Sequence, residues 1–374
     1  MKLLYVAHNH PPEKAPLENI GGMQRVSIQL LSEFEKNNRV EVEEAVLHSS
    51  WKKIGINTFL FLLKQMFRLP AAARSSGADA ILFSSMVTAS LSLFIRKRVD
   101  IPLVAITHGK DVTLPVGIYQ WLVPKIFSRL DGVISVSRAT RRACIERGLD
   151  PDKCVALGNG FNMERLRVFP DKQASREALS STFGIDLENK YMLLTVGRQV
   201  KRKGHEWFIR EVFPKLGDNM VFVLIGDGPE SESIRQVADE SGLGNRIYLL
   251  GKQPDEILKQ SYAAADLFVM PNIPVEGDME GFGIVLLEAN MASTPAVAAD
   301  LEGIRDVITD GENGFRIPPL DDRMFARKIN AVLKNGLSEF SERSRNHVES
   351  KFSWDHVAAE YLDFISSVIE RKNA

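Results

Sequence analysis

The chain has 374 residues, and its 47 Lys and Arg residues nearly balance its 48 Asp and Glu residues, for a formal net charge of -1. This balance argues against nucleic acid as a partner. No stretch reaches the roughly 18 consecutive apolar residues that a membrane-spanning helix needs. The two cysteines are typical of the reducing cytoplasm rather than of a disulfide scaffold. The length exceeds what one hydrophobic core usually serves, so we expect two domains.

The first half of the chain alternates between apolar, strand-like runs and amphipathic helical stretches. Lys2–Ala7 is a short buried-strand pattern, and the apolar positions from Val26 to Phe34 predict a helix that begins near Gly22. Strands that alternate with helices form a parallel sheet with helices on both faces, so residues 1–168 are predicted to form one α/β domain. The other strands predicted in this half are Val40–Leu47, Asp79–Ser84, Leu103–Thr107 and Gly132–Val136.

The same alternation repeats in the second half, where residues 190–351 are predicted to form a second α/β domain. The polar segment Phe169–Lys190 is the best candidate for a linker. The last segment, 352–374, has the apolar spacing of a long amphipathic helix, which could cover the second domain or return to the first. The strands predicted in this half are Tyr191–Val196, Val221–Ile225, Ile247–Leu250, Leu267–Met270 and Pro295–Ala299.

Unusual residues follow several of these strands, at the carboxyl ends where open α/β sheets bind ligands. Gly21 and Gly22 follow the first strand, and they either form a flexible turn or let the backbone approach a phosphate closely. His108 follows the strand that ends at Thr107. A single histidine is more often a structural hydrogen-bond partner, but this position favours a role in an active site.

A basic cluster follows the first strand of the second half. Arg198 and residues 201–203, with the sequence Lys-Arg-Lys, are bracketed by Gly197 and Gly204. Such a run is usually a solvated face. Directly after a buried strand it suits a diphosphate, because Arg offers a planar fork of donors and Lys a compact charge.

Residues 271–288 form the most specific element. The strand Leu267–Met270 ends in an acidic, glycine-rich loop, which opens directly into an apolar helix that begins near Ile284. This order places free backbone N–H groups at a helix N-terminus, which favours an anion or polar hydroxyl groups. Glu280 and Glu288 lie at the two ends of the element, and their spacing suits two parts of one elongated ligand better than the carboxylate pair of a glycosidase.

No cluster of His, Cys, Asp and Glu in the sequence has the spacing of metal ligands. Asp150 and Asp152 flank Pro151, and this order is typical of a turn and a helix start. We therefore expect no metal cofactor.

The motifs along the chain have a recognisable order. They are Gly21-Gly22, His108-Gly109, Asn159-Gly160, Gly197-Arg198 with Lys203-Gly204, Gly226-Asp227-Gly228-Pro229, and Glu280 with Glu288 in the sequence EGFGIVLLEA. In this order they resemble the retaining glycosyltransferases of family 4, also described as glycosyl transferases group 1. The paired glutamates are the specific part of the match, which extends over nearly the whole chain.

The resemblance implies the GT-B fold, in which two Rossmann-like domains with parallel sheets face each other across a cleft. It implies a hexosyltransferase whose donor, a GDP- or UDP-linked hexose, binds mainly to the second domain. The acceptor would be a hydroxyl group of a glycan, a lipid-linked molecule or a small molecule, bound by the first domain. Such enzymes need no metal and retain the anomeric configuration of the donor.

The resemblance also implies roles for individual residues. Arg198 and Lys203 would neutralise the diphosphate, Glu280 would hold hydroxyls of the donor sugar, and His108 would lie near the reacting centre. The other expected donor contacts are Gly21, Gly22 and Gly197 near the diphosphate, Lys252 and Gln253 near the base, the backbone of Phe282, Gly283 and Ile284 at the sugar, and Glu288 at the ribose.

The segment after Ala299 departs from the family pattern. A Gly-Gly pair and a Glu are common there, whereas this chain has Asp300-Leu301-Glu302-Gly303-Ile304-Arg305-Asp306, which leaves one donor or acceptor contact open. Two alternatives remain at this stage. One is another enzyme of the same architecture, such as a sugar-nucleotide epimerase or a phosphorylase, and the other is a non-catalytic nucleotide-sugar-binding protein.

Residues 51–74 have two interpretations. They contain five basic residues and no acidic residue, and Phe59, Leu63 and Phe67 recur at helical spacing. The segment could be a helix packed on the sheet of the first domain. It could instead lie on an anionic membrane with its apolar face in the lipid, which would place a cytoplasmic protein at the inner face of the cell membrane and suit a lipid-linked acceptor.

Overall fold

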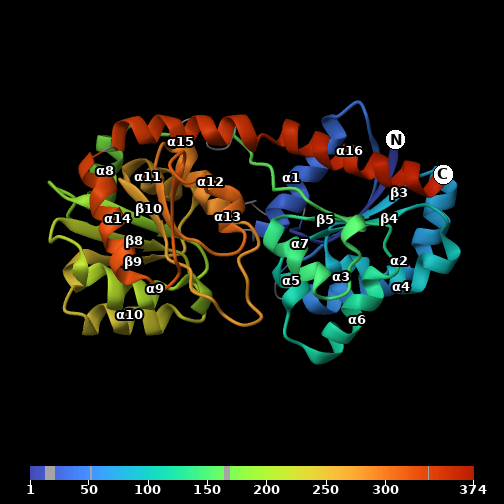
Figure 1. Ribbon diagram of the computed structural model, residues 1–374, viewed down its shortest axis with the longest axis horizontal. Helices are drawn as coiled ribbons and strands as arrows, with labels where there is room; N and C mark the ends of the chain where they lie inside the picture. The colour runs from blue at the N-terminus through green and yellow to red at the C-terminus, as the bar shows by residue number, and fades with distance from the viewer. Residues whose placement is uncertain (13–21, 51–52, 164–168, 336) are drawn as a thin grey trace. The chain divides into compact units, whose positions relative to one another are not determined.

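The structure is a computed structural model that describes residues 1–12, 22–50, 53–163, 169–335 and 337–374 (Figure 1). Its contacts divide the chain into two compact units, Met1–Gly160 with Trp354–Ala374, and Phe161–Ser353. Each unit is built on one six-stranded sheet. Every strand pair recorded in the two sheets is parallel. The predicted α/β class with two parallel sheets is confirmed.

The first unit has the strand order β2-β1-β3-β4-β5-β6. Its central strands are completely buried and mostly apolar, as expected for a parallel sheet covered on both faces. Its strands are β1 Lys2–His10, β2 Glu41–His48, β3 Ala80–Phe83, β4 Leu103–Thr107, β5 Gly132–Ser135 and β6 Cys154–Ala156. Its helices are α1 Gly22–Lys36, α2 Ile54–Ser76, α3 Met86–Ala89, α4 Ser92–Ile95, α5 Lys110–Thr113, α6 Gly117–Phe127, α7 Arg138–Ile145 and α16 Trp354–Asn373.

The final helix α16 belongs to the first unit, where it packs along α1 and β5 (Figure 1). Trp354 anchors its first turn, because its side chain is buried and its indole N–H donates to Gln29 Oε1 at 2.9 Å. A Cβ on Gly160 would lie 2.3 Å from the Trp354 ring. The close contact shows that the chain leaves the first unit and re-enters it at two adjacent points.

The second unit has the strand order β12-β11-β10-β7-β8-β9. Its core contains a group of aromatic side chains, in which Phe222 packs against Phe208 and Phe213 at ring distances of 4.7 and 5.9 Å. Its strands are β7 Tyr191–Val196, β8 Met220–Ile225, β9 Ile247–Gly251, β10 Leu267–Met270, β11 Ala296–Ala299 and β12 Gly314–Ile317. Its helices are α8 Lys172–Phe183, α9 His205–Trp207, α10 Ser231–Glu240, α11 Asp255–Ala264, α12 Ile284–Met291, α13 Ile304–Val307, α14 Asp322–Asn335 and α15 Leu337–Lys351.

The prediction of a linker over Phe169–Lys190 is wrong, because α8 occupies most of this segment. Asp171 caps its first turn by accepting a hydrogen bond from Ala174 N at 3.0 Å, and Gly184 ends it in the left-handed conformation. The helix buries Leu179 and carries Arg176, which bonds to Asp266 at 3.2 Å. The polar residues that resembled a linker are the solvent-facing side of this helix.

Two edge strands were not predicted. β6 has only three residues, and β12 has four and is interrupted by Arg316. An edge strand pairs on one side alone, so its sequence carries a weaker hydrophobic signal than that of a central strand.

Candidate functional site

In the sheet of the second unit, β8 and β9 follow on one side of β7, and β10, β11 and β12 follow on its other side. The order in which strands are added therefore reverses at β7. In open α/β sheets, ligands bind outside the carboxyl ends of the strands at such a point. The segments that leave this edge are Gly197–Gly204 after β7 and residues 271–283 after β10. They contain most of the site residues predicted for the second domain.

The loops after β7, β8 and β9 are bonded together through their backbones. Gly197 N donates to Ile225 O at 2.9 Å, and Gly226 N donates to Gly251 O at 2.8 Å. A Cβ on Gly226 would lie 1.9 Å from the Gly197 oxygen, so the approach of these two loops requires glycine. Lys252 is exposed directly after β9, and Gln253 donates to Leu250 O at 2.5 Å.

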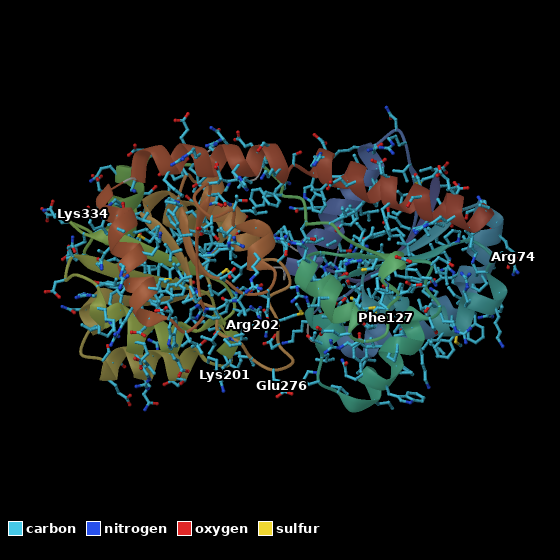
Figure 2. All side chains as sticks on the ribbon, viewed as in Figure 1. Arg74, Phe127, Lys201, Arg202, Glu276 and Lys334 are labelled. Carbon is cyan, nitrogen blue, oxygen red and sulfur yellow. The ribbon has the colours of Figure 1, made fainter. Side chains whose placement is uncertain are left out.

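The loop after β7 is also fixed to the loop after β10. Ile273 N donates to Arg202 O at 2.9 Å. A Cβ on Gly204 would lie 2.1 Å from the Pro271 oxygen, so only glycine permits this contact. The short helical turn Lys201–Lys203 is therefore held against the segment that carries Glu280 (Figure 2).

Glu280 is the centre of a buried polar cluster in the second unit. One of its oxygens, Oε2, accepts hydrogen bonds from Lys203 Nζ at 2.6 Å, from Asn272 Nδ2 at 3.1 Å and from Arg202 Nη1. Arg202 Nε also lies 3.4 Å from Asp278 Oδ1. Lys203 and Glu280 are 6% and 8% exposed, so this ion pair is largely shielded from solvent.

The cluster shifts the titration of its members. Burial by itself would raise the pKa of Glu280, but Lys203 and then Arg202 lower it to about 2. Burial lowers the pKa of Lys203, and the charge of Glu280 opposes this change. The Glu280 carboxylate is therefore kept ionised and held in one orientation. A side chain that accepts hydrogen bonds from polar groups of a ligand needs both properties.

Glu302 approaches the same cluster from the segment after β11. Its Oε2 accepts a hydrogen bond from Glu280 N at 2.5 Å. Burial, together with the charge of Glu280, raises its pKa to about 7, although the hydrogen bond opposes this shift. Its backbone has φ of +48°, a left-handed conformation that favours glycine. This is the position where the sequence departs from the family pattern.

The N-terminus of α12 opens from the same loop. Gly283 is its N-cap, with φ of +94° and no side-chain cap. Phe282 is buried and packs edge-on against Phe352 at 6.0 Å between ring centroids, and Ile284 is half-buried. One turn beyond, Glu288 is buried and accepts a hydrogen bond from the Tyr262 hydroxyl at 2.7 Å.

His108 lies in the first unit, directly after β4. Its Nε2 is 2.8 Å from Ser84 O, and its backbone N donates to Asp111 Oδ1 at 2.7 Å. Burial and then the charge of His108 lower the pKa of the neighbouring His8 to about 4. His8 lies near the end of β1 and His108 directly after β4, so both lie at the carboxyl edge of this sheet. The direction in which successive strands are added to the sheet changes between β1 and β3.

The structure brings together only part of the predicted site directly. Lys203 contacts Glu280, and Gly197 lies beside the Lys203 side chain, with 3.5 Å between its Cβ position and Lys203 Cε. Arg198 is exposed on the same loop. In the first unit, Gly22 is the first residue of α1, and Gly21 lies outside the described residues.

Four residues that bond to Glu280 or Glu288 were not predicted as site residues. Arg202 stood in the basic run, and Glu302 marked a departure from the family pattern, so both had a signal in the sequence. Asn272 and Tyr262 had none, because an isolated amide or hydroxyl can be assigned to a carboxylate only once the fold has brought the two together.

Among the residues that the structure describes, no three His, Cys, Asp or Glu side chains gather in a way that could hold a metal ion. None of the described helices is long and apolar enough to cross a membrane.

The two parallel sheets and the strand-end site define the chain as a GT-B protein. The crystal structure of Anabaena HepE in complex with UDP and glucose superposes with a TM-score of 0.74 at 20% identity, over 98% of this chain and 100% of that one. Residues 20–165 match the family described as Glycosyltransferase Family 4, and residues 180–350 match Glycosyl transferases group 1. The chain belongs to the glycosyltransferases that these two family descriptions cover, Glycosyltransferase Family 4 in its first half and Glycosyl transferases group 1 in its second.

Named relatives agree with this assignment. An uncharacterized glycosyltransferase of Methanocaldococcus jannaschii is 28% identical over 64% of this chain and 60% of its own length. The GDP-mannose-dependent alpha-(1-6)-phosphatidylinositol monomannoside mannosyltransferase of Mycobacterium tuberculosis is 27% identical over 70% of this chain and 69% of its own length. The match thus spans about three fifths to two thirds of these two relatives.

Proposed function

We propose that this protein is a retaining hexosyltransferase that moves a hexose from a nucleotide diphosphate sugar to a hydroxyl acceptor without a metal ion. The observation that carries the proposal is the buried Lys203–Glu280 pair beside the uncapped N-terminus of α12. Together they offer an ionised acceptor for sugar hydroxyls and donors for a diphosphate at one edge of one sheet.

The diphosphate would bind to the loop after β7 and to the start of α12. Arg198 is exposed on that loop, and a helix N-terminus favours an anion. Lys203 donates one hydrogen bond to Glu280, and an ammonium group has three donors, so it can also reach a phosphate oxygen. These groups would stabilise the negative charge that grows on the departing diphosphate.

The hexose would be held by Glu280 and by the backbone N–H groups of Phe282, Gly283 and Ile284. Glu280 Oε2 is occupied by Lys203, Arg202 and Asn272. Its other oxygen is thereby oriented, and it is the one we assign to sugar hydroxyls. Glu288 would bind the ribose, and the segment Lys252–Gln253 would border the base.

Transfer would break the bond between the anomeric carbon and the phosphate oxygen, and the electron pair would leave with the diphosphate. The acceptor hydroxyl would attack the same face, and its proton would pass to the phosphate oxygen that has just been freed. His108, fixed through Ser84 and Asp111, is the residue that we assign to the reacting centre from the first unit.

The donor is expected to carry UDP or GDP. HepE was crystallised with UDP and glucose, and the mycobacterial relative is named as GDP-mannose-dependent. The acceptor hydroxyl would belong to a glycan, a lipid-linked molecule or a small molecule.

A thermal-shift panel of UDP-, GDP- and ADP-sugars tests donor binding, and the best donor then enters a transfer assay with NMR of the product. We expect one donor to raise the melting temperature of the protein, and we expect the product to keep the donor's anomeric configuration. Absence of binding by every donor would refute the nucleotide-sugar site, and an inverted product would refute retention. The matched control is Glu276→Gln, which changes an exposed carboxylate of the same loop.

A further inference from the structure

The helix α2 carries an apolar stripe that the protein does not cover. One face of the helix packs inward, where Phe61, Leu69 and Ala73 are buried. On another face the large apolar residues recur with the spacing of successive helical turns. These exposed residues are Ile56 (71% exposed), Phe59 (66%), Leu60 (55%), Leu63 (47%) and Phe67 (64%). The helix α2 is therefore packed on one side, as the first interpretation of the sequence requires, and exposes large apolar side chains on another.

Two neighbouring helices also expose large apolar side chains. The helix α4 contacts both α2 and α6, and the three lie side by side in the first unit (Figure 1). Phe94 of α4 is 57% exposed, and Ile118 and Trp121 of α6 are 72% and 61% exposed. Leu114 and Val116, which precede α6, are exposed as well. Adjoining exposed groups of this kind are uncommon on monomeric proteins and usually mark an interaction site.

The same segments carry basic charge only. Residues 45–78, 80–99 and 112–130 contain five, three and two Lys or Arg residues and no Asp or Glu. Over the whole chain, 47 basic residues face 48 acidic ones. The helices that expose the apolar side chains thus carry no acidic residue themselves, and the exposed Glu44 of β2 lines the groove beside α2.

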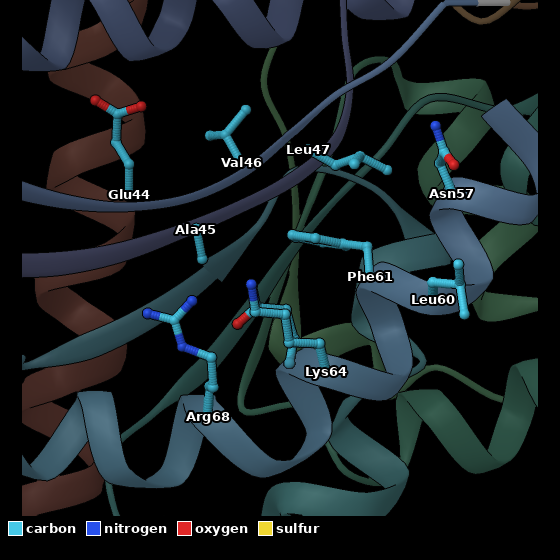
Figure 3. A pocket seen from close by; sticks show the side chains of 10 residues that line it. Glu44, Ala45, Val46, Leu47, Asn57, Leu60, Phe61, Lys64 and Arg68 are labelled. Atoms are coloured by element: carbon cyan, nitrogen blue, oxygen red, sulfur yellow. The ribbon is translucent and has the colours of Figure 1, made fainter. Parts of the chain in front are cut away.

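The basic residues lie beside the apolar stripe. Lys64 and Arg68 are exposed on α2 and border a groove of about 400 Å³ between this helix and β2 (Figure 3). On α6, Lys125 Nζ lies 2.9 Å from the centroid of the exposed Trp121 ring. Lys and Trp side chains with an apolar body and a polar tip suit the boundary between lipid and water.

We propose that the surface formed by α2, α4 and α6 docks onto an anionic lipid bilayer. The apolar side chains would enter the acyl boundary while the basic side chains remain among the headgroups. A second copy of the chain is a poorer occupant, because a two-fold contact would set two basic surfaces against each other. This inference concerns residues outside the donor site and stands independently of the proposed function.

Co-sedimentation of the full chain with vesicles tests the proposal without donor or acceptor. Vesicles of phosphatidylcholine alone are compared with vesicles that also contain phosphatidylglycerol. We expect binding that requires the anionic lipid and weakens as salt increases. Failure to bind anionic vesicles at low salt would overturn the proposal, and it would leave transfer to a soluble acceptor unaffected.

Three pairs of substitutions divide the surface into its parts. Phe59→Ser with Phe67→Ser should lower the partition coefficient at least tenfold, because two large apolar side chains leave the lipid. Lys64→Gln with Arg68→Gln should lower it about fivefold for each charge and reduce the salt dependence. Ile118→Ser with Trp121→Ser tests the part contributed by α6, and it should also lower partitioning about tenfold or more.

The matched control is Met324→Ser, which removes an exposed apolar side chain of the second unit (40% exposed). It should bind vesicles as the wild type does. Binding that survives the Ile118 and Trp121 changes would overturn a surface shared by three helices. Self-association in solution that the Phe59 and Phe67 changes abolish, together with no vesicle binding, would identify a second copy as the occupant and overturn the lipid assignment.

Discussion

Replacing Glu302 by glutamine tests whether the polar cluster of the second unit works as described. Glu302 Oε2 accepts a hydrogen bond from Glu280 N at 2.5 Å. A glutamine keeps an acceptor oxygen for this bond but cannot ionise. The substitution therefore separates the geometry of the contact from its charge.

The magnitude follows from the pKa of Glu302, which burial, with the charge of Glu280, raises from 4.5 to about 7. Between these values the folded protein keeps a proton that the unfolded chain releases, so the group lowers the free energy of unfolding as pH rises through this window. The full difference corresponds to about 3 kcal/mol. Because the side chain is partly exposed, solvent screening reduces this to about 1–2 kcal/mol.

Glu302→Gln should consequently match the wild type near pH 5 and exceed its free energy of unfolding by about 1–2 kcal/mol near pH 8. Urea unfolding at a series of pH values measures the difference, and Glu276→Gln, a change of an exposed carboxylate in the neighbouring loop, should show no such trend. An equal destabilisation of Glu302→Gln at both pH values would mean that the effect of the substitution does not come from titration of Glu302 in this window, and the reasoning would be wrong.

Four further outcomes are expected. Glu280→Gln should leave donor affinity within about tenfold in calorimetry but lower turnover strongly, because its grip matters most as the sugar gains charge; wild-type turnover would contradict this. Arg198→Ala and Lys203→Ala should each lower kcat/KM about 10²–10³-fold in initial-rate assays, and normal transfer by the double variant would exclude the diphosphate role. EDTA should not reduce the rate; a loss restored by Mn²⁺ would refute metal independence. Gly160→Ala should lower the stability of the first unit by about 1–3 kcal/mol in thermal unfolding through overpacking against the indole of α16, whereas Gly55→Ala, which meets open space, should not.

The sequence predicted the central strands well because they are buried on both faces. β4, β7 and β10 have the predicted bounds, since a strand covered by helices on both faces reads as an unbroken apolar run. β12 contains Arg316, and its two middle residues are only partly buried. Its sequence of polar and apolar residues therefore does not differ from that of a loop. In α8, Asp171 and Gly184 were sufficient signals for the two ends of a helix, but its polar surface favoured the linker interpretation.

The site was predictable where one short segment contains both its chemistry and its geometry. The order of strand, glycine loop and helix around Glu280 is such a segment, and α12 begins at Ile284 as predicted. The contact of Glu302 with Glu280 depends on how two separate loops meet, and the contact of Asn272 with Glu280 depends on how the loop after β10 folds back on itself. Residue spacing along the chain carries no information on those distances.

The charges of the cluster indicate how its basic residues divide their roles. Arg202 and Lys203 face Asp278 and Glu280 at 3.4 and 2.6 Å, so these four side chains nearly balance before any donor binds. Positive charge for a diphosphate would then come chiefly from Arg198 and the N-terminus of α12.

We therefore expect Arg198→Ala to weaken binding of a nucleoside diphosphate and of its sugar conjugate by a similar factor in calorimetry. Lys203→Ala should instead reduce mainly the additional affinity that the hexose provides, because it leaves the buried carboxylate of Glu280 with Arg202 as its remaining bonded cation. Removing one partner of a buried pair costs about 3–5 kcal/mol, so this variant should also unfold at lower urea concentration than Arg198→Ala. Equal losses for both ligands in both variants would show that Lys203 contributes to diphosphate binding as much as Arg198 does and that the balance of charge within the cluster does not decide its role.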